Sequence, residues 1–371
     1  MKKLVFIALI SGLAYFAYTT MTDRANDGES LTRAQMGIAD RAVADFMARH
    51  KVPALSLAWA KDGEMVLTKA YGAASIENNI LATPRHLFRI ASISKPITAT
   101  MIMHLVEQGK LRLDDNVFGE GGILAEEFSS KDPYTRMITV RRLLQHGAGS
   151  EWGNEVDDPM FLNPFYTHDE LIQWVLNTRN LSRAPGTSYN YSNFGYSVLG
   201  RVIEKVSGQD YDDYFKTMTS SVMPNNFAIT SDYNSGGNRE VQYYAQEEVS
   251  AYAIPARRMD SHGGWIATPT DMVNFLLLVD GNDSPPDILQ PESIRTMTTP
   301  SPHNVNYALG WGVNQFDNWW HMGSLPGTGS VAVRTGDNQA WAVFVNTRSL
   351  SPNFDTDLDG LMWRITQSIR L

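Results

Sequence analysis

Residues 89–99 read RIASISKPITA and place a serine, a lysine three positions later and a proline directly after it. Proline is tolerated in the first turn of a helix, because the N–H groups there have no partner within the helix. We therefore predict a helix that begins at Ser92 and runs to about Gly109. The Ser92 and Lys95 side chains would lie on one helical face, with Cβ atoms about 5–6 Å apart.

Two interpretations fit this serine and lysine. They are either ordinary helix residues, a cap and a surface charge, or a nucleophile and its base. A helix N-terminus carries roughly half a positive charge, which favours a developing alkoxide on Ser92. The same charge opposes the ammonium form of Lys95, as burial would, and a partly neutral lysine can take the serine proton. On its own, Ser-x-x-Lys does not decide between the two.

Composition limits the kinds of protein that this chain can be. It has 371 residues, 43% of them hydrophobic and 19% charged, an ordinary globular mixture. A net charge of -9 disfavours nucleic acid as a partner, because such binding relies on a basic surface. The absence of cysteine excludes disulfides, thiol nucleophiles and thiolate metal sites. No histidine pair has the H-E-x-x-H spacing, so we expect neither a metal nor another cofactor.

The first 22 residues have the layout of an export signal. Lys2 and Lys3 precede an apolar run over residues 4–18, and the first acidic residue is Asp23. The cleavage site is poor, so an uncleaved membrane anchor through residues 4–20 is the alternative to a signal peptide at 1–22. Residues 23–30 are polar and are predicted to be a tether. We therefore expect an exported protein, periplasmic or anchored in the inner membrane, whose functional domain covers 31–371.

The remaining chain contains helical and strand-like patterns. Apolar residues recur at three- and four-residue spacing over 31–51, which predicts a helix. Two strand-like runs, 54–60 and 65–71, flank Asp62-Gly63, a hairpin signal because both turn residues tolerate positive φ. Four further short strands are predicted within 307–347. Other helices are predicted at 137–145, 168–179, 194–207, 210–220, 270–279, 291–297 and 355–369.

Strands therefore lie at both ends of the chain, and helices fill its middle. The simplest packing is an α/β (α+β) fold, with one antiparallel sheet built from both chain ends and flanked by helices. A mainly helical lobe, about residues 112–260, would be inserted between the two groups of strands. A site is expected in the cleft between the lobes. The polar segment 232–250 fits no element, although it could line that cleft.

A second candidate group, Tyr191-Ser192-Asn193, lies in the loop before the helix at 194–207. A tyrosine in a wet loop titrates at about pH 10. Two cationic neighbours would lower this pKa and would make the phenolate of Tyr191 a proton shuttle. The alternative is a structural tyrosine, with a packed ring and a hydroxyl that bonds to the backbone.

A third candidate group follows the strand-like run NWWHMG at 318–323. Gly323 would let a ligand approach the strand backbone closely. An N–H group at this edge, together with that of Ser92, could form an oxyanion hole. His262 also begins an H-x-G pattern, but we prefer His321 because strand-like sequence flanks it on both sides. The alternative is that His321 is a lone structural histidine.

In this order the three groups resemble the serine β-lactamase and penicillin-binding-protein superfamily, above all the class C β-lactamases, the DD-peptidases and the related esterases. The resemblance extends from about residue 32 to residue 370. It includes the segments RIASISKPITA (89–99), LLQHGAGS (143–150), APGTSYNYSNFGYSVLGRVIEKVSG (184–208), GGWIATPTDM (263–272) and HMGSLPGTGS (321–330). Each segment is weak alone, whereas the ordered set is specific. The fold of that superfamily agrees with the element order inferred above.

The resemblance implies roles for the first two groups. Ser92 would attack an acyl carbonyl and become acylated. Lys95 and Tyr191 would share the proton transfers. Asn193 would orient Lys95 and bind the substrate amide.

The third group differs from the family pattern. His321 takes the position that is often lysine in β-lactamases, and the resemblance implies that it steers a substrate carboxylate and adjusts the tyrosine. The N–H groups of Ser92 and Ser324 would form the oxyanion hole, and Asn154 would contact substrate. The motif is H-x-G rather than K-T-G, which is similar to several DD-peptidases and esterases and argues against an efficient β-lactamase.

The sequence therefore predicts a serine hydrolase that acts through a Ser92 acyl-enzyme on an amide or ester. Its substrate would be a small molecule or peptide, such as a D-alanyl peptide derived from peptidoglycan, a β-lactam or a small ester. The alternative is a non-catalytic, penicillin-binding-like receptor for cell-wall fragments. A third interpretation, an unrelated structural protein, requires all three groups to be accidental. Transfer of the acyl group to water or to another acceptor is left open.

Overall fold

The computed structural model of the chain describes residues 31–223, 226–230, 239–254, 256–369 and 371. The export signal or anchor expected at 1–22 and the tether expected at 23–30 lie outside this part of the chain. None of the helices in the described part combines the length and the apolar character needed to cross a membrane.

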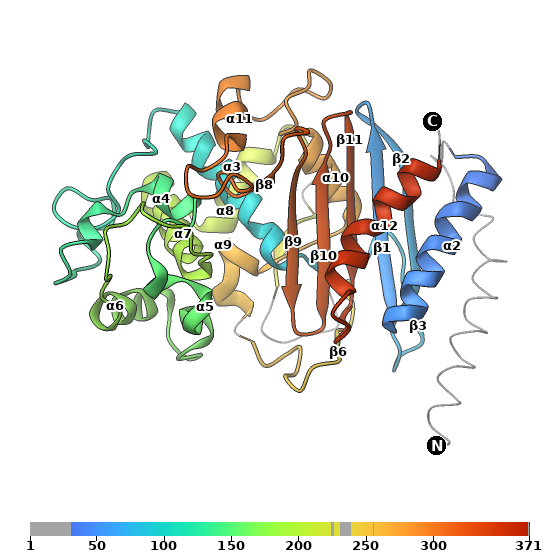
Figure 1. Cartoon of the computed structure of the whole chain (residues 1–371), viewed down its shortest axis with the longest axis horizontal. Helices are drawn as coiled ribbons and strands as arrows, with labels where there is room; N and C mark the ends of the chain where they lie inside the picture. Colours follow the sequence, from blue (N-terminus) through green and yellow to red (C-terminus); the bar gives the residue numbers. More distant parts are fainter. Residues whose placement is uncertain (1–30, 224–225, 231–238, 255, 370) are drawn as a thin grey trace.

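A seven-stranded sheet built from both ends of the chain forms one half of the molecule (Figure 1). Its order is β3-β2-β1-β11-β10-β9-β8, and neighbouring strands are antiparallel. The strands are β1 (Ala54–Lys61), β2 (Glu64–Ser75), β3 (Ile80–Leu81), β8 (Gly312–Val313), β9 (Trp319–Leu325), β10 (Thr328–Arg334) and β11 (Gln339–Val345). The chain ends meet where β1 pairs with β11, so the predicted sheet is confirmed.

The hairpin β1–β2 forms where the sequence predicts it, because Asp62 and Gly63 adopt φ values of 50° and 84°. Strand β1 is buried on both faces. Ala54, Ala58 and Ala60 pack in the large core that the helical half shares. The alternate residues of β1, Leu55, Leu57 and Trp59, pack in a second core on the opposite face. This explains the nearly continuous apolar run, since a strand covered on both sides need not alternate with polar residues.

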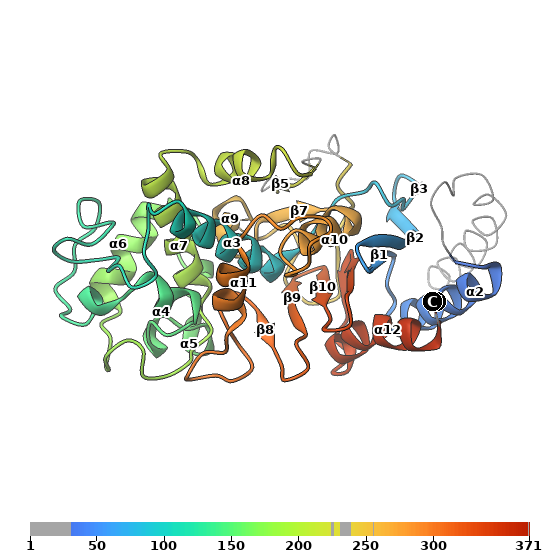
Figure 2. The same ribbon diagram turned by 90° about the horizontal axis from the view of Figure 1, so that it is seen from above.

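The second core lies beneath two terminal helices, α2 (Arg33–His50) and α12 (Phe354–Ser368), which pack on one face of the sheet (Figure 2). Helix α2 begins at a capping box, in which the Thr32 hydroxyl accepts from the Gln35 N–H and the Gln35 side chain accepts from the Thr32 N–H. It ends where Lys51 adopts a φ of 53°. Helix α10 (Pro269–Leu277) packs on the other face.

The helical half lies at the opposite end of the molecule from α2 (Figures 1 and 2). Its α-helices are α4 (Val140–Leu144), α5 (Asn154–Asp157), α6 (His168–Thr178), α7 (Asn193–Ser207), α8 (Tyr211–Thr219) and α9 (Asp260–Gly263), with α11 (Pro291–Thr298) beside them. The helix expected at 137–145 is instead the 3₁₀ turn Thr135–Met137 followed by α4. Thr139 between them is extended, and its side chain caps α4 by accepting from the Arg142 N–H.

Two small sheets join the halves. The strands β4 (Phe88–Arg89), β7 (Trp265–Ala267) and β5 (Ala228–Ile229) form one, in the order β4-β7-β5. The other pairs β6 (Tyr244–Ala245) with β12 (Thr347–Arg348) in parallel. The described part of the segment 232–250 thus contains a short strand next to the main sheet, while residues 232–238 lie outside the described part.

Helix α3 (Ser94–Glu107) runs through the large core between the two halves (Figure 1). Every residue from Ser94 to Met103 is buried. A helix that is buried all round must be apolar or satisfy its polar groups internally. The Thr98 and Thr100 hydroxyls do so by donating to main-chain carbonyls. The start of α3 is therefore a rigid platform for any side chain that it carries.

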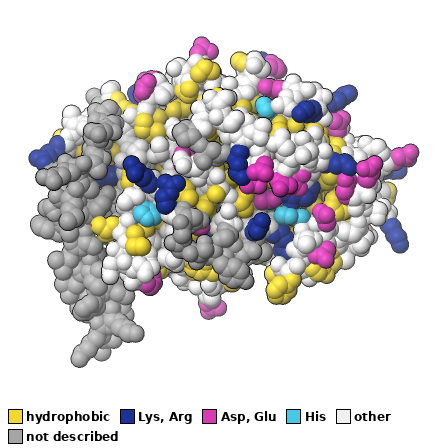
Figure 3. All heavy atoms as spheres, turned by 180° about the vertical axis from the view of Figure 1, so that it is seen from behind, with side chains coloured by type: hydrophobic (Ala, Val, Ile, Leu, Met, Phe, Trp, Pro, Cys, Tyr) yellow, Lys and Arg dark blue, Asp and Glu magenta, His cyan; other side chains and the backbone are white. Residues whose placement is uncertain are grey.

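The rear face of the molecule carries charged side chains of both signs (Figure 3). Among the side chains drawn in colour there, basic and acidic groups are interspersed and no extended basic surface is seen. This face therefore produces no large electrostatic field of a single sign.

Candidate active site

A cleft of about 620 Å³ lies between the helical half and strand β9. Seven of the eight residues predicted to form the site line this cleft: Ser92, Asn154, Tyr191, Asn193, His321, Gly323 and Ser324. The eighth, Lys95, is fully buried and contacts Ser92. Residues separated by more than 230 positions in the chain thus share one site.

Ser92 lies in a 3₁₀ turn, Ala91–Ile93, and α3 begins at Ser94. The regular helix therefore begins two residues later than the sequence predicts. The reason is the backbone of Ala91, whose φ of 47° is a left-handed conformation that a residue with a side chain rarely adopts. Such strain costs of the order of 1–3 kcal/mol and is typical of active sites. It leaves Ser92 at a tight turn on the cleft wall.

Lys95 fills its hydrogen-bonding capacity inside the protein. Its Nζ donates to Ser92 Oγ at 3.1 Å, to Asn193 Oδ1 at 2.8 Å and to the His262 carbonyl at 3.0 Å. Burial lowers the pKa of Lys95 from 10.5 to about 7, and the nearby Asp158 carboxylate partly opposes this shift. About half of the molecules therefore carry a neutral amine at pH 7, in contact with the serine hydroxyl.

Tyr191 lies in the loop just before α7, whose N-cap is Ser192. Its hydroxyl interacts with the Ser92 side chain, which partly opposes the shift in its pKa, and the Lys95 Nζ lies 4.7 Å from its ring centroid. The expectation that cationic neighbours lower the pKa of Tyr191 is wrong, because burial raises it well above its usual value. Tyr191 is a neutral phenol at pH 7, able to donate one proton while it accepts another.

His321 is held in one tautomer by its neighbours. Its Nδ1 lies 2.7 Å from the Met322 carbonyl, so it carries the proton, and Nε2 faces the Tyr307 hydroxyl at 3.4 Å. Burial and the nearby Lys95 lower the pKa of His321 to about 3. The imidazole is therefore uncharged near neutral pH, and the expected role of His321 in steering a substrate carboxylate stays a prediction.

Gly323 has a structural role as well as a place on the cleft wall. A Cβ atom here would lie 2.2 Å from the Ile90 carbonyl oxygen and 2.3 Å from Ser330 Oγ. The absence of a side chain at Gly323, which was expected to admit a ligand, thus makes room for the backbone turn that carries Ser92. Within the described sheet, β8 pairs with β9 only at Trp319 and Trp320, so the next residues of β9, Ser324 among them, face the cleft.

Asp158 is a site residue that the sequence did not reveal. It lines the cleft, and its Oδ2 accepts from Asn193 Nδ2 at 2.7 Å while Oδ1 accepts from the Met160 N–H at 3.0 Å. The first bond fixes the amide of Asn193 so that its oxygen faces Lys95. Asn154 supports the same residue, since its Oδ1 accepts from the Asn193 N–H at 2.9 Å. The sequence offers no signal for Asp158, which only precedes a proline in a loop.

His146 is a second site residue that the sequence did not reveal, although it lies in a segment that resembles the superfamily. Its ring centroid lies 4.3 Å from that of Tyr191. Its Nδ1 accepts from the Ser192 N–H at 3.0 Å, so the proton is on Nε2, which donates to the Tyr307 hydroxyl at 3.0 Å. His146 thus fixes the loop that carries Tyr191. Burial lowers its pKa well below that of an ordinary histidine.

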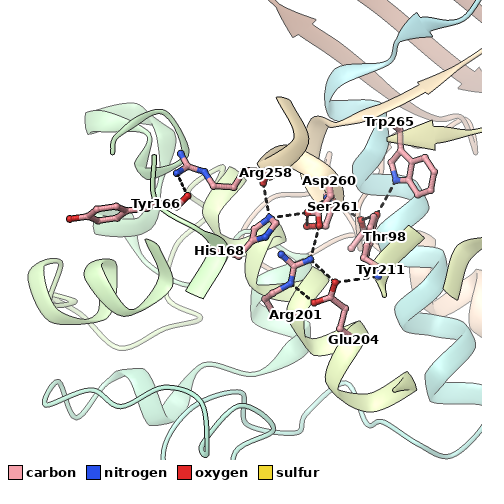
Figure 4. A network of polar contacts seen from close by, with 10 residues as sticks. All are labelled: Thr98, Tyr166, His168, Arg201, Glu204, Tyr211, Arg258, Asp260, Ser261 and Trp265. Carbon is pink, nitrogen blue, oxygen red and sulfur yellow. Dashed lines mark hydrogen bonds and ion pairs between the residues drawn. The ribbon is translucent and has the colours of Figure 1, made fainter. Parts of the chain in front are cut away.

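The buried polar network in Figure 4 adjoins, in the chain, the carbonyl that accepts from Lys95. That carbonyl belongs to His262 in α9, whose first residue, Asp260, pairs with Arg201 at 2.6 Å. Thr98 of α3 donates to the next carbonyl of α9, that of Ser261, at 2.6 Å. The two contacts connect α9 to α7 and α3, the elements that supply Asn193 and Lys95.

Arg258 connects this network to the loop after Asp158 (Figure 4). Its guanidinium is buried and donates to four main-chain carbonyls, those of Met160, Leu162, Asn163 and Tyr166. A single side chain thus fixes the loop that follows Asp158 and carries Phe161 to the cleft wall. Among the described residues, no three histidine, aspartate or glutamate side chains are grouped closely enough to hold a metal ion.

Comparison with known sequences gives a family match over most of the chain. The Beta-lactamase family model matches residues 39–361. The protein flp of Staphylococcus aureus (strain N315) is 24% identical over 321 residues, which are 84% of this chain and 63% of that protein. The chain therefore spans less than two thirds of the length of this relative.

Solved structures share the fold. The octameric penicillin-binding protein homologue from Pyrococcus abyssi superposes with a TM-score of 0.72 at 25% identity, over 88% of this chain and 77% of that one. The D-amino acid amidase from Ochrobactrum anthropi SV3 superposes with a TM-score of 0.74 at 22% identity, over 90% of this chain and 98% of that one. Because the family match covers most of the sequence, the chain belongs to the beta-lactamase family.

Proposed function

We propose that this protein is a serine hydrolase that cleaves an amide or ester through an acyl-enzyme on Ser92. The observation that carries the proposal is the contact of 3.1 Å between Ser92 Oγ and Lys95 Nζ, an amine whose pKa burial lowers to about 7. A base with a pKa near the operating pH is the most effective one. An amide is included among the substrates because the D-amino acid amidase from Ochrobactrum anthropi SV3 shares the fold.

Acylation uses the groups around Ser92 as follows. Neutral Lys95 takes the proton from Ser92 Oγ while this oxygen forms a bond to the substrate carbonyl carbon. The carbonyl oxygen becomes an oxyanion, to which the N–H groups of Ser92 and Ser324 would donate. Tyr191 donates its proton to the leaving nitrogen or oxygen and recovers one from Lys95, so the scissile bond breaks and the base becomes neutral again.

Deacylation repeats the proton transfers with a second nucleophile. Water, or another alcohol or amine, attacks the ester carbonyl and loses its proton to Lys95 through the Tyr191 hydroxyl. The bond to Ser92 Oγ breaks, and this oxygen recovers a proton from Lys95. Asn193 holds the amine in register for both steps, with its own amide fixed by Asp158.

Intact-protein mass spectrometry after mixing with a fluorescent phosphonate and a panel of esters, D-amino peptides and β-lactams tests the proposal. We expect a stoichiometric adduct in the wild type and none in Ser92→Ala. Ser182→Ala, a change at an exposed serine, is the matched control and should label normally. Labelling that persists in Ser92→Ala contradicts the proposal. Tight binding of cell-wall fragments without any adduct would instead favour the receptor.

The proposed location is outside the cytoplasm, as the sequence of residues 1–22 suggests. N-terminal sequencing of protein recovered from a periplasmic extract and from membranes would distinguish a cleaved signal from an anchor. Recovery from the cytoplasm alone would contradict both.

A further inference from the structure

The charged side chains that line the cleft in the described part of the chain are both acidic. They are Asp158, beside Asn193, and Asp355, at the start of α12. No lysine or arginine is among the described lining residues. The two histidines of the lining, His262 and His321, are uncharged, because burial holds the pKa of each well below the usual value. The cleft wall thus has negative charge and no fixed positive charge.

Lys95, the cation that contacts Ser92, is not available to a substrate carboxylate. Lys95 is fully buried, and its three N–H groups donate to Ser92, Asn193 and His262. An ammonium group has three donors, so none is left for a ligand. Lys95 must also be neutral to act as the base, and in that state it offers no charge at all.

Asp158 is held in place to receive a donor from the cleft. Each carboxylate oxygen already accepts one hydrogen bond, from Met160 or from Asn193, and has a further lone pair. The loop after it is fixed by the four carbonyl contacts of Arg258. Arg179, the other cation that acts on Asp158, donates to main-chain carbonyls, among them that of Asp157 at 2.9 Å.

Among the described residues, no lysine or arginine forms an ion pair with Asp158, and the nearby Lys95 offers no charge to it when neutral. A cationic group on the substrate would supply a counter-ion, whereas a carboxylate would meet repulsion without any compensating partner. The positive group would also favour the neutral form of Lys95 and so promote its action as a base. Phe161, three residues after Asp158, adds a half-exposed aromatic ring to the same wall.

We propose that the acyl donor carries a protonated amine near its scissile carbonyl and no carboxylate on its leaving group, and that Asp158 binds this ammonium. The substrate class is thus amino-acid amides, amino-acid esters or peptides with a free N-terminus. This inference rests on the proposed function, and it excludes β-lactams and peptides with a free C-terminal carboxylate as efficient substrates.

The test compares three anilides of phenylalanine, each in both enantiomers, that differ in the group on nitrogen: a free amine, an acetyl group or a succinyl group. We expect kcat/KM for the better enantiomer of the free amine to exceed that of the acetyl compound at least tenfold, or about 1.4 kcal/mol. The succinyl compound, which is anionic, should be the poorest. The preference should decline above about pH 8, where an α-amine loses its proton.

Variants at two adjacent carboxylates provide the matched comparison. Asp158→Asn keeps the size and the hydrogen-bonding ability of the side chain and should bring the ratio of amine to acetyl compound to within about threefold of unity. Asp157→Asn removes the same charge one residue away, from an exposed side chain, and should retain the tenfold preference. Circular dichroism and phosphonate labelling confirm that both variants are folded.

The possible results separate this inference from the proposed function. If the acetyl compound acylates Ser92 and is hydrolysed as fast as the amine, the charge inference is wrong and the serine hydrolase stands. The same holds if Asp158→Asn keeps the wild-type preference. If no compound and no phosphonate modifies Ser92, both proposals fail. The comparison of the three substrates uses the wild type alone, so it tests the inference even if Asp158→Asn does not fold.

Discussion

The pH dependence of acylation depends on one buried amine. Burial lowers the pKa of Lys95 from 10.5 to about 7. Its neutral fraction is then roughly 1% at pH 5 and roughly 90% at pH 8. If neutral Lys95 is the base, the rate constant for Ser92 acylation rises almost 100-fold over this interval and levels off above about pH 8. An ordinary lysine would give a rate that still increases tenfold per pH unit at pH 9.

Few neighbours of Lys95 should add a titration of their own to this pH profile. Burial keeps the pKa of His146 and His321 well below that of an ordinary histidine and raises the pKa of Tyr191 well above its usual value. Burial also raises the pKa of the Asp158 carboxyl. Asp158 favours the protonated form of Lys95, so Asp158→Asn should move the rising limb to lower pH, by about half to one pH unit.

Stopped-flow acylation with an uncharged ester, at constant ionic strength from pH 5 to pH 9.5, measures the profile. The uncharged ester removes the ionisation of the substrate from the result. Lys95→Arg is the control, because arginine stays protonated throughout, and it should lose a factor of about 10²–10⁴ in rate. A rate that is flat over this range, or a limb that disappears in Asp158→Asn, would refute the assignment of the limb to Lys95.

Four stability predictions follow from contacts in and around the site. Lys95→Met should abolish acylation yet raise the melting temperature measured below pH 7, because the folded wild type holds a buried ammonium group at that pH. A melting temperature equal to or below that of the wild type would contradict this prediction. The wild-type free energy of unfolding should accordingly increase as pH rises from about 7 toward 10.5, because in this range Lys95 is protonated in the unfolded chain and neutral in the folded one. Urea titrations at several pH values measure this increase. Gly323→Ala should lower the free energy of unfolding by about 1–3 kcal/mol in urea, since its Cβ would overlap the Ile90 carbonyl, whereas Gly37→Ala, at a partly exposed position of α2, should not destabilise the protein. Arg258→Met should lower it by about 2–4 kcal/mol, because four main-chain carbonyls lose their donor, whereas Arg295→Met, at a surface ion pair, should change it by less than about 1 kcal/mol.

The sequence predicted the local structure well where one segment carries its own signal. Proline in a first helical turn, Asp62-Gly63 between apolar runs and the strand pattern on both sides of His321 each depend on residues close together in the chain. It also supplied the ordered motifs from which the superfamily could be inferred. The boundaries that differ, such as the 3₁₀ turn at Ser92, depend on a backbone conformation at Ala91 that its own side chain does not favour.

The protonation states of the site depend on burial and on residues distant in the chain. Sequence alone allowed Tyr191 to be a phenolate and left the charge of His321 open, because it cannot show that both lie in a desolvated pocket. Asp158 is hydrogen-bonded to Asn193 and His146 to Ser192, and these partners lie 35 and 46 residues away in the chain. No local sequence pattern could therefore identify Asp158 or His146 as site residues.

The sequence by itself thus determined which chemical groups are present and the elements on which they lie, since helix, hairpin and motif signals act over a few residues. Only the tertiary structure decided the charge of each group. A pKa is set by the loss of water and by neighbours in space, and packing brings Lys95, Tyr191, Asp158 and His321 together from four separate parts of the chain.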